Sequence, residues 1–318
     1  MPVTVTVPAT TANLGSGFDC LGAALTIYNR FTFTDRSVEH SAEHSAEHSQ
    51  ASPDNRNALE IIVRGVEADR VDTGEDNMIY QAFCRLYAAI DRPVPPVTIE
   101  IDLGVALSRG LGSSATAIVG GIVGANELAG RPLDTTALGN LATAIEGHPD
   151  NVIPALMGGF RLAVPDGEHW IVSELAWNGA IVPVVAIPDF ELSTADSRRV
   201  LPDTYSRSDA AFNAAHVSLL IQGLATANGD WVRVGIDDRL HQPYRVALIA
   251  GYRAVEAAAI AAGAYGVAIS GAGPTILALC SPTTAEAVVE AMATTWKTHG
   301  ITPDVRQVEL DYTGVQVA

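Results

Sequence analysis

The positions of hydrophobic and polar residues along the 318-residue chain predict a succession of short strands and longer helices. Alternating or β-branched runs predict strands at residues 3–7, 25–33, 97–103, 160–164, 181–187, 267–269 and 275–280. Helical spacing of apolar residues appears at residues 59–68, 77–90, 115–129, 135–146 and 247–262. Pro8 is expected to end the first strand, because proline has no backbone N–H. Both halves mix the two element types, so we expect an α+β protein with domains at residues 1–162 and 163–318.

One segment has no apolar face. Residues 39–50 contain the tetrad Glu-His-Ser-Ala twice and then Glu-His-Ser-Gln. Short polar tracts of this kind are usually solvated, so we expect a low-complexity surface insert. Histidines four residues apart could also share a helical face and bind a metal, and that alternative stays open.

Composition and charge exclude several classes of protein. Hydrophobic residues make up 48% of the chain and charged residues 17%, which is enough apolar material for a large core. The three cysteines are far apart and lack metal-ligand spacing, so neither a disulfide framework nor a zinc site is expected. We find no leader pattern and no membrane-length apolar run, and therefore expect a cytoplasmic protein. A net charge of −17 disfavours nucleic acid and anionic membranes as partners.

Lysine is almost absent, and this narrows the chemistry. Lys297, near the carboxyl terminus, is the only lysine, whereas arginine occurs eighteen times. A Walker phosphate loop, a protein kinase and a Schiff-base enzyme each need a lysine at the reacting site. All three classes are therefore disfavoured, and an anionic ligand must be bound by arginine, metal or backbone N–H groups.

A glycine-rich run directly precedes the small-residue helix predicted at 115–129. Its residues are Arg109, Gly110, Leu111, Gly112, Ser113, Ser114, Ala115 and Thr116. Glycines allow close approach to a ligand, and the unpaired N–H groups of a first helical turn attract anions. The pattern therefore favours a phosphate site, although a glycine turn before a helix can also be purely structural.

Three further polar clusters carry candidate chemistry. Asn13 and Asp19 follow the first strand, where they could bind a ligand or only cap the turn. The run from Glu146 to Asn151 supplies a carboxylate that could hold Mg²⁺ with a loop serine, since Mg²⁺ takes few protein ligands. Arg198 and Arg245 could grip an acid group bidentately, and each could equally be an ordinary surface residue.

Together, residues 8–19, 109–116, 146–151 and 270–274 resemble the ordered motifs of the GHMP small-molecule kinase superfamily. The most specific motifs are Pro-Ala-Thr-Thr-Ala-Asn-Leu-Gly followed by Gly-Phe-Asp, and Glu-Gly-His-Pro-Asp-Asn-Val. Within the superfamily the chain resembles the homoserine kinases, because Thr11 occupies the region in which mevalonate-type relatives have a lysine. Ser16 and Ala106 depart from the pattern, since both stand where proline is common.

The resemblance implies a two-domain GHMP kinase fold, with an amino-terminal domain like domain 2 of ribosomal protein S5 and a ferredoxin-like carboxyl-terminal domain. It also implies ATP as a substrate, Mg²⁺ as a cofactor, L-homoserine as the acceptor and a homodimer. The residues implied for ATP are those of the 109–116 loop, together with Gly271 and Gly273 of the second glycine turn. Those implied for Mg²⁺ are Ser114 and Glu146.

Roles around the acceptor also follow from the resemblance. The homoserine carboxylate is expected to meet Arg198 and Arg245, its amino group Asn13 and Asp19, and its hydroxyl Asn151, with His148 supporting this wall. Asn151, Asp19 and Arg198 are the expected catalytic residues, and Arg109 is expected to help stabilise the phosphoryl oxygens. Asp150 is a rival general base. Two other functions remain open: a GHMP kinase for a different hydroxy acid, and a nucleotide-binding protein without catalysis.

Overall fold

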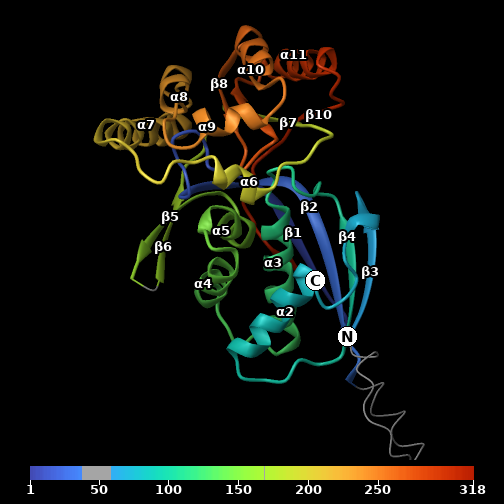
Figure 1. The fold of residues 1–318 in the computed structure, drawn as a ribbon. Helices are drawn as coiled ribbons and strands as arrows, with labels where there is room; N and C mark the ends of the chain where they lie inside the picture. The colour runs from blue at the N-terminus through green and yellow to red at the C-terminus, as the bar shows by residue number, and fades with distance from the viewer. Residues whose placement is uncertain (38–58, 168) are drawn as a thin grey trace, which may run out of the picture.

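Two sheets form the frame of the computed structural model, which describes residues 1–37, 59–167 and 169–318 (Figure 1). The insert expected at residues 39–50 lies outside these ranges. The first sheet has the order β11-β1-β2-β4-β3, and β5 extends it by pairing with both β2 and β6. Its strands are β1 Val3–Ala12, β2 Leu21–Asp35, β3 Leu59–Gly65, β4 Val97–Leu103, β5 Phe160–Asp166, β6 His169–Leu175 and β11 Gln316–Val317.

Helices that pack against the first sheet bury one large apolar core. They are α2 Met78–Ala89, α3 Ser113–Leu128, α4 Thr135–Glu146 and α5 Pro149–Met157. The small residues of α3 explain its depth, because a side chain at Gly120 or Gly124 would overlap the rings of Phe31 and Phe33 on β2. The expectation that this helix is buried against a sheet is confirmed.

The second sheet is antiparallel and has the order β10-β7-β9-β8. If the four strands are numbered by their order along the chain, the sheet has the order 4-1-3-2, which is that of a ferredoxin-like sheet. Its strands are β7 Val182–Ile187, β8 Ala264–Ile269, β9 Ile276–Cys280 and β10 Asp304–Gln307. Successive strand residues face opposite sides, so Val184 packs with one core and Val185 with another. The expected α+β, two-domain fold is confirmed.

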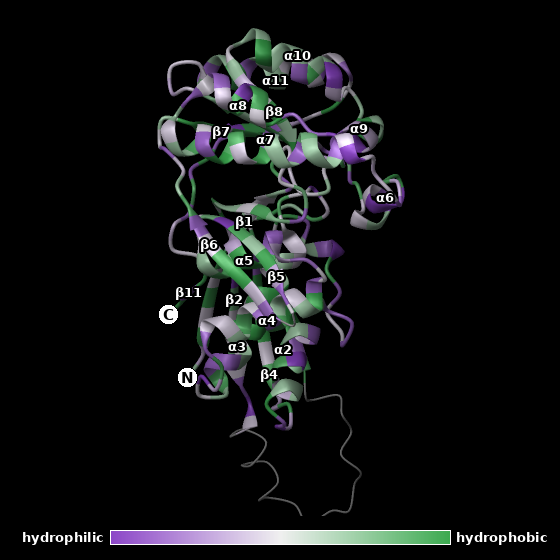
Figure 2. Ribbon diagram, turned by 90° about the vertical axis from the view of Figure 1, so that its left-hand side faces the viewer, coloured by the Kyte–Doolittle hydropathy of each residue, from purple (hydrophilic) through white to green (hydrophobic). Residues whose placement is uncertain are grey.

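Helices cover both faces of the second sheet, and Figure 2 shows hydrophobic and hydrophilic positions alternating along them. The core on one face includes α10 and α11, whereas the other includes α7, α8 and parts of the first domain. The helical elements are α6 Thr194–Arg199, α7 Arg207–Thr226, α8 Gly229–Gly235, α9 Gln242–Arg245, α10 Tyr252–Ala261 and α11 Ala285–Thr298, with short 3₁₀ turns at Ala68–Arg70 and Val246–Leu248. Among the described residues, no helix is long and apolar enough to cross a membrane.

Three predictions from local pattern need correction. The helix expected at 59–68 is mostly the strand β3, because β-branched Ile61 and Val63 pair in parallel with β4. Pro8 does not end β1, since a shift in pairing between Pro8 and Ala9 lets the strand continue. The boundary expected after residue 162 falls inside β5, and β6 also belongs to the first sheet. The change between sheets therefore lies between Leu175 and Val182.

Candidate active site

The glycine-rich loop holds the N-terminus of α3 open at the junction of the two domains. Gly110 and Gly112 adopt φ values of 79° and 67°, a conformation that favours glycine. A Cβ at Gly112 would overlap the hydroxyl of Thr10 and lie 3.1 Å from Oδ1 of Asn151. The loop therefore needs glycine both for its backbone angle and for its contact with β1 and α5. The unpaired N–H groups of the first turn of α3 provide an anion site.

A cavity of about 110 Å³ lies in front of this loop. Of the residues predicted for the site, it is lined by Asn13, Gly110, Gly112, Ser113, Ser114, Glu146, His148, Asn151, Arg198, Arg245, Gly271 and Gly273. The remaining lining residues are Ser108, Leu192, Thr194 and Ala272. The side chains of Leu111, Ala115 and Thr116 are buried in the fold, so only their backbone could serve a ligand at the loop. The tertiary structure thus brings together motifs that are more than 200 residues apart in the sequence.

Two oxygen ligands of the kind that Mg²⁺ prefers meet at the cavity wall. The hydroxyl of Ser114 donates a hydrogen bond of 2.7 Å to Oε1 of Glu146. Burial raises the pKa of Glu146, and the hydrogen bond from Ser114 offsets part of this shift. The described residues contain no cluster of three acidic, histidine or cysteine side chains arranged for a metal. A hydroxyl and a single carboxylate suit a cation that takes its other ligands from phosphate and water.

The start of α5 carries three polar side chains, of which His148 and Asn151 line the cavity. Nδ1 of His148 lies 2.8 Å from Oδ1 of Asp150. Burial by itself would lower the pKa of His148, but the hydrogen bond and the charge of Asp150 raise it above the usual value. Asn151 accepts a hydrogen bond of 2.7 Å from Thr10 Oγ1, which fixes its amide beside the loop. Asp150 is fully buried and does not line the cavity, whereas Asn151 does.

Opposite charges meet beside the cavity, which Arg198 and Asn13 line and Asp19 does not. Arg198 donates to both carboxylate oxygens of Asp19, at 2.8 and 3.3 Å. Asn13 accepts from the backbone N–H of Asp19 at 2.8 Å and donates to the carbonyl of Gly271 at 3.1 Å. Asn13 and Asp19 both have positive φ, at 56° and 54°, and such strain in non-glycine residues concentrates at functional sites. Side by side, the acid and the guanidinium match the two charges of an amino-acid zwitterion.

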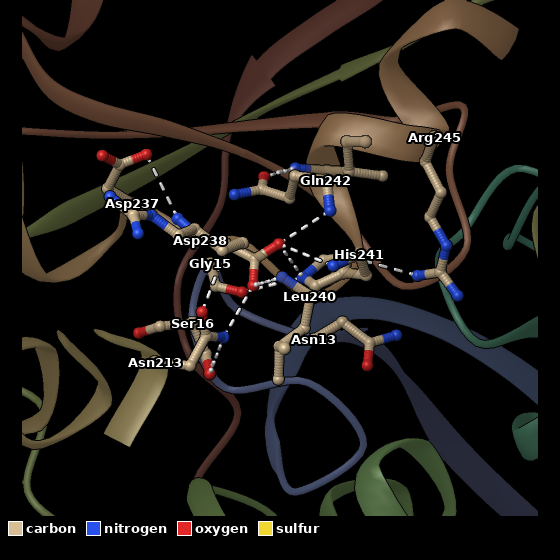
Figure 3. A network of polar contacts seen from close by, with 12 residues as sticks. Asn13, Gly15, Ser16, Asn213, Asp237, Asp238, Leu240, His241, Gln242 and Arg245 are labelled. Carbon is tan, nitrogen blue, oxygen red and sulfur yellow. Dashed lines mark hydrogen bonds and ion pairs between the residues drawn. The ribbon is translucent and has the colours of Figure 1, made fainter. Parts of the chain in front are cut away.

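Arg245 approaches the same cavity from α9 and is 1% exposed. Figure 3 shows it at one end of a polar network that includes His241 and Asp238 and reaches the loop of Gly15 and Ser16. Sequence analysis did not identify His241 or Asp238. They are distant in sequence from the glycine loop, and no local pattern distinguishes them from residues that merely begin a helix.

Arg109 occupies a different place from the one expected. Its guanidinium lies 3.1 Å from Glu67 and 2.9 Å from Glu191, and it donates to the carbonyls of Leu107 and Pro188 at 2.7 and 3.0 Å. These contacts join the two domains behind the loop, and Arg109 does not line the cavity. The guanidinium is therefore paired with groups of the protein, and the role expected of it against phosphoryl oxygens stays a prediction.

A second hollow, of about 350 Å³, opens on the other side of the loop and was not anticipated. It shares Ser108, Ser113 and Ser114 with the first cavity and extends between β2, β4 and the start of α2. Its walls include Phe31, Ile79, Ile101 and Leu103. Among the residues that line this hollow, Asn77 is the N-cap of α2, and a helix cap of this kind can be recognised from sequence.

Comparisons with known proteins agree with this arrangement. The GHMP kinases N terminal domain family matches residues 77–159, and the GHMP kinases C terminal family matches residues 219–298. Homoserine kinase from Microchaete diplosiphon is 57% identical over 312 residues, covering 98% of this chain and 96% of that protein. Homoserine kinase from Synechococcus sp. is 53% identical, covering 100% of this chain and 98% of that protein.

Solved structures extend the comparison. The crystal structure of homoserine kinase from Cytophaga hutchinsonii matches with a TM-score of 0.84 at 28% identity, covering 100% of this chain and 97% of that one. Mevalonate kinase of L. major matches with a TM-score of 0.69 at 13% identity, covering 95% and 94% of the chains, and shows only the shared fold. The near-complete coverage by relatives above 50% identity, together with both family matches, decides the assignment. The chain belongs to the GHMP kinases and, among them, to the homoserine kinase family.

Proposed function

We propose that this protein transfers the terminal phosphoryl group of ATP to the side-chain hydroxyl of L-homoserine, which yields O-phospho-L-homoserine for threonine biosynthesis. The observation that carries the proposal is a single cavity lined by the glycine loop, the Ser114 and Glu146 pair and two arginines. The name shared by the relatives supports homoserine as the acceptor.

ATP would occupy the two hollows on either side of the loop. Its phosphates would lie against the N–H groups at the start of α3, where the helix dipole and the unpaired donors favour negative charge. The second hollow has apolar side chains such as Phe31 and Ile79 among its polar lining residues and would take the adenine ring. The loop serines that border both hollows would then lie between the base and the transferred phosphate.

Mg²⁺ would be held by Ser114 and Glu146, because these are the hydroxyl and carboxylate that meet in the cavity. When bound, the cation supplies positive charge against the phosphate oxygens. Burial makes the charged form of Glu146 unfavourable unless a cation lies beside it. The raised pKa is therefore consistent with a carboxylate that binds a cation.

Homoserine would lie along the opposite wall. Arg198 and Arg245 would bind its carboxylate, and Asn13 and Asp19 its ammonium group. The bidentate pair of Asp19 and Arg198 presents one charge of each sign, which suits an α-amino acid. Asn151 would orient the hydroxyl toward the phosphate, because its side chain lines the cavity and is fixed by Thr10.

Alignment and charge stabilisation account for most of the catalysis in this proposal. Phosphoryl transfer has a loose transition state, so it depends on placing the hydroxyl in line and on stabilising the phosphate oxygens. An amide cannot accept a proton as a base at neutral pH, so Asn151 would position the hydroxyl and not deprotonate it. Asp150 is a poor candidate for the base because it is buried beneath His148 and outside the cavity.

We also propose that the protein is cytoplasmic and that it forms a homodimer. ATP-dependent biosynthesis supports the first, and only the family resemblance supports the second. Light scattering coupled to size exclusion tests the dimer directly, and a mass of one chain across the working concentration range would refute it.

Release of ADP, measured with a panel of hydroxy amino acids and hydroxy acids, tests the main activity. We expect magnesium-dependent turnover of L-homoserine, with the phosphate found on its side-chain oxygen by phosphorus NMR. Arg198→Leu should raise the KM for homoserine at least about tenfold while the KM for ATP is kept. Turnover of mevalonate or shikimate in place of homoserine would overturn the proposal.

A further inference from the structure

The network behind Arg245 shows how this arginine is held. Its Nε donates to the carbonyl of Ser197 at 3.2 Å. Its Nη1 donates to the carbonyl of Gly271 at 3.1 Å and lies 3.3 Å from Nδ1 of His241. In the part of the chain that the structure describes, Nη2 has no hydrogen-bond partner, although Arg245 lines the cavity. The contacts on one side therefore leave the remaining end of the fork for a ligand.

The two partners of the His241 ring fix its protonation state. Nε2 lies 2.7 Å from the carbonyl oxygen of Gly15, which can only accept, so Nε2 must carry the hydrogen. Nδ1 faces the guanidinium of Arg245, which can only donate, so Nδ1 must be the acceptor. Both requirements are met by one neutral tautomer. A second hydrogen on Nδ1 would point at the positive charge of Arg245.

The charges around His241 agree with a neutral ring. Its side chain is fully buried, and this burial lowers its pKa, with a further lowering by Arg245 and an opposing effect of Asp238. Nε2 lies 3.6 Å from Asp238, but the oxygens of that carboxylate already accept from the N–H groups at residues 240–242 and from the Asn213 amide. Asp238 therefore mainly holds the turn that leads into α9, through the hydrogen bonds drawn in Figure 3. Phe18 stacks on the other side, 5.1 Å from the ring of His241, and Asp19 is the remaining charged group that acts on it.

His241 also connects the two sides of the acceptor site. Gly15 and Phe18 belong to the first-domain loop that carries Asn13 and Asp19, whereas Arg245 belongs to the second domain. The guanidinium of Arg245 lies 5.3 Å from the Phe18 ring, so the loop contacts both members of the His241 and Arg245 pair. A shift of the imidazole would change the distance between the fork and the residues proposed for the ammonium group.

We propose that neutral His241 is a positioning residue, which accepts from Arg245 and donates to Gly15 so that the free end of the arginine fork is aimed at the carboxylate of the substrate. This inference rests on the proposed role of Arg245 in binding that acid group. His241 does not line the cavity, so its effect should fall on the KM for homoserine and little on that for ATP.

Two substitutions separate a positioning role from simple packing. His241→Phe keeps a flat ring against Phe18 but removes both hydrogen bonds, and it should raise the KM for homoserine about tenfold, the scale of one hydrogen bond to a charged group. His241→Asn places an amide oxygen close to the position of Nδ1, so it should recover a large part of that loss. The KM for ATP and kcat should stay within about twofold in both variants. Equal homoserine KM values for His241→Phe and wild type would overturn the proposal, as would a larger defect in His241→Asn.

The proposal can also be tested in the unaltered protein. In ¹⁵N-histidine-labelled protein near neutral pH, the signals that disappear in His241→Asn should be those of a neutral ring protonated at Nε2. A charged ring, or a hydrogen on Nδ1, would refute the inference even if His241→Phe failed to fold. Arg245→Leu separates this inference from the proposed acid-binding role. An unchanged homoserine KM in Arg245→Leu rejects the acid-binding role of Arg245 itself. If the homoserine KM rises in Arg245→Leu but not in His241→Phe, only the positioning by His241 is rejected.

Discussion

Replacement of Arg109 by alanine should weaken the fold more than it weakens ATP binding. The Arg109 side chain is 7% exposed and contacts Glu67, Glu191 and backbone carbonyls on both sides of the domain junction. Removing one partner of a buried ion pair costs about 3–5 kcal/mol. Glu67 and Glu191 are 21% and 35% exposed, so water can solvate the carboxylates that remain. We therefore expect the lower end of the range, about 3 kcal/mol.

Unfolding in urea and thermal unfolding measure this loss directly. At roughly 2 °C per kcal/mol for a protein of this size, the Tm should fall by about 6 °C. Arg70→Ala is the matched control, because Arg70 contacts the same two carboxylates but is 42% exposed. Solvent screens such pairs, so the control should lose no more than about 1 kcal/mol. The KM for ATP should stay within about twofold of wild type in both variants.

The opposite result would refute this account of Arg109. An unchanged unfolding transition, combined with a KM for ATP raised tenfold or more, would mean that the guanidinium contacts the phosphates and not the domain junction. It would restore the role that the glycine-loop pattern alone suggested.

Three further changes test other parts of the structure. Gly112→Ala puts a side chain on a residue in the left-handed conformation, which costs about 1–2 kcal/mol. The added methyl group would also overlap the hydroxyl of Thr10, so kcat/KM should fall at least about tenfold. Wild-type kinetics would contradict the close packing of the loop. Hydrogen bonds from Arg70 and Arg109 hold the pKa of Glu191 at about 2, below its usual value of 4.5. The unfolded chain therefore takes up a proton first as pH falls, and the native state loses stability from about pH 4.5 toward pH 2. In Glu191→Gln the decline of the urea midpoint over this range should be shallower, and an identical decline would contradict the pairing. Asp150→Asn should keep kcat within about threefold, because the carboxylate lies outside the cavity; a loss of about a hundredfold or more would identify Asp150 as a general base.

Local sequence predicted best where one segment carries its own signal. The helix α3 was anticipated because a glycine turn leads into small residues that tolerate burial, and the structure places it against Phe31 and Phe33. The spacing of residues 59–68 suits either a helix or a strand, and only pairing with β4 makes most of this region a strand. The effect of Pro8 also depends on pairing, since a shift in register accommodates it within β1.

The sequence by itself determined the class of chemistry. A glycine loop before a helix, a near absence of lysine and two arginines limited the means of binding an anion, and ordered motifs suggested the family. The tertiary structure alone decided which polar groups share a cavity and which are hydrogen-bonded or ion-paired elsewhere. It committed the guanidinium of Arg109 to the domain junction, opened a second hollow beside the loop and placed His241 between Arg245 and Gly15. These outcomes depend on contacts between residues far apart in the chain, and on which hydrogen-bond donors are already paired, so no local pattern could contain them.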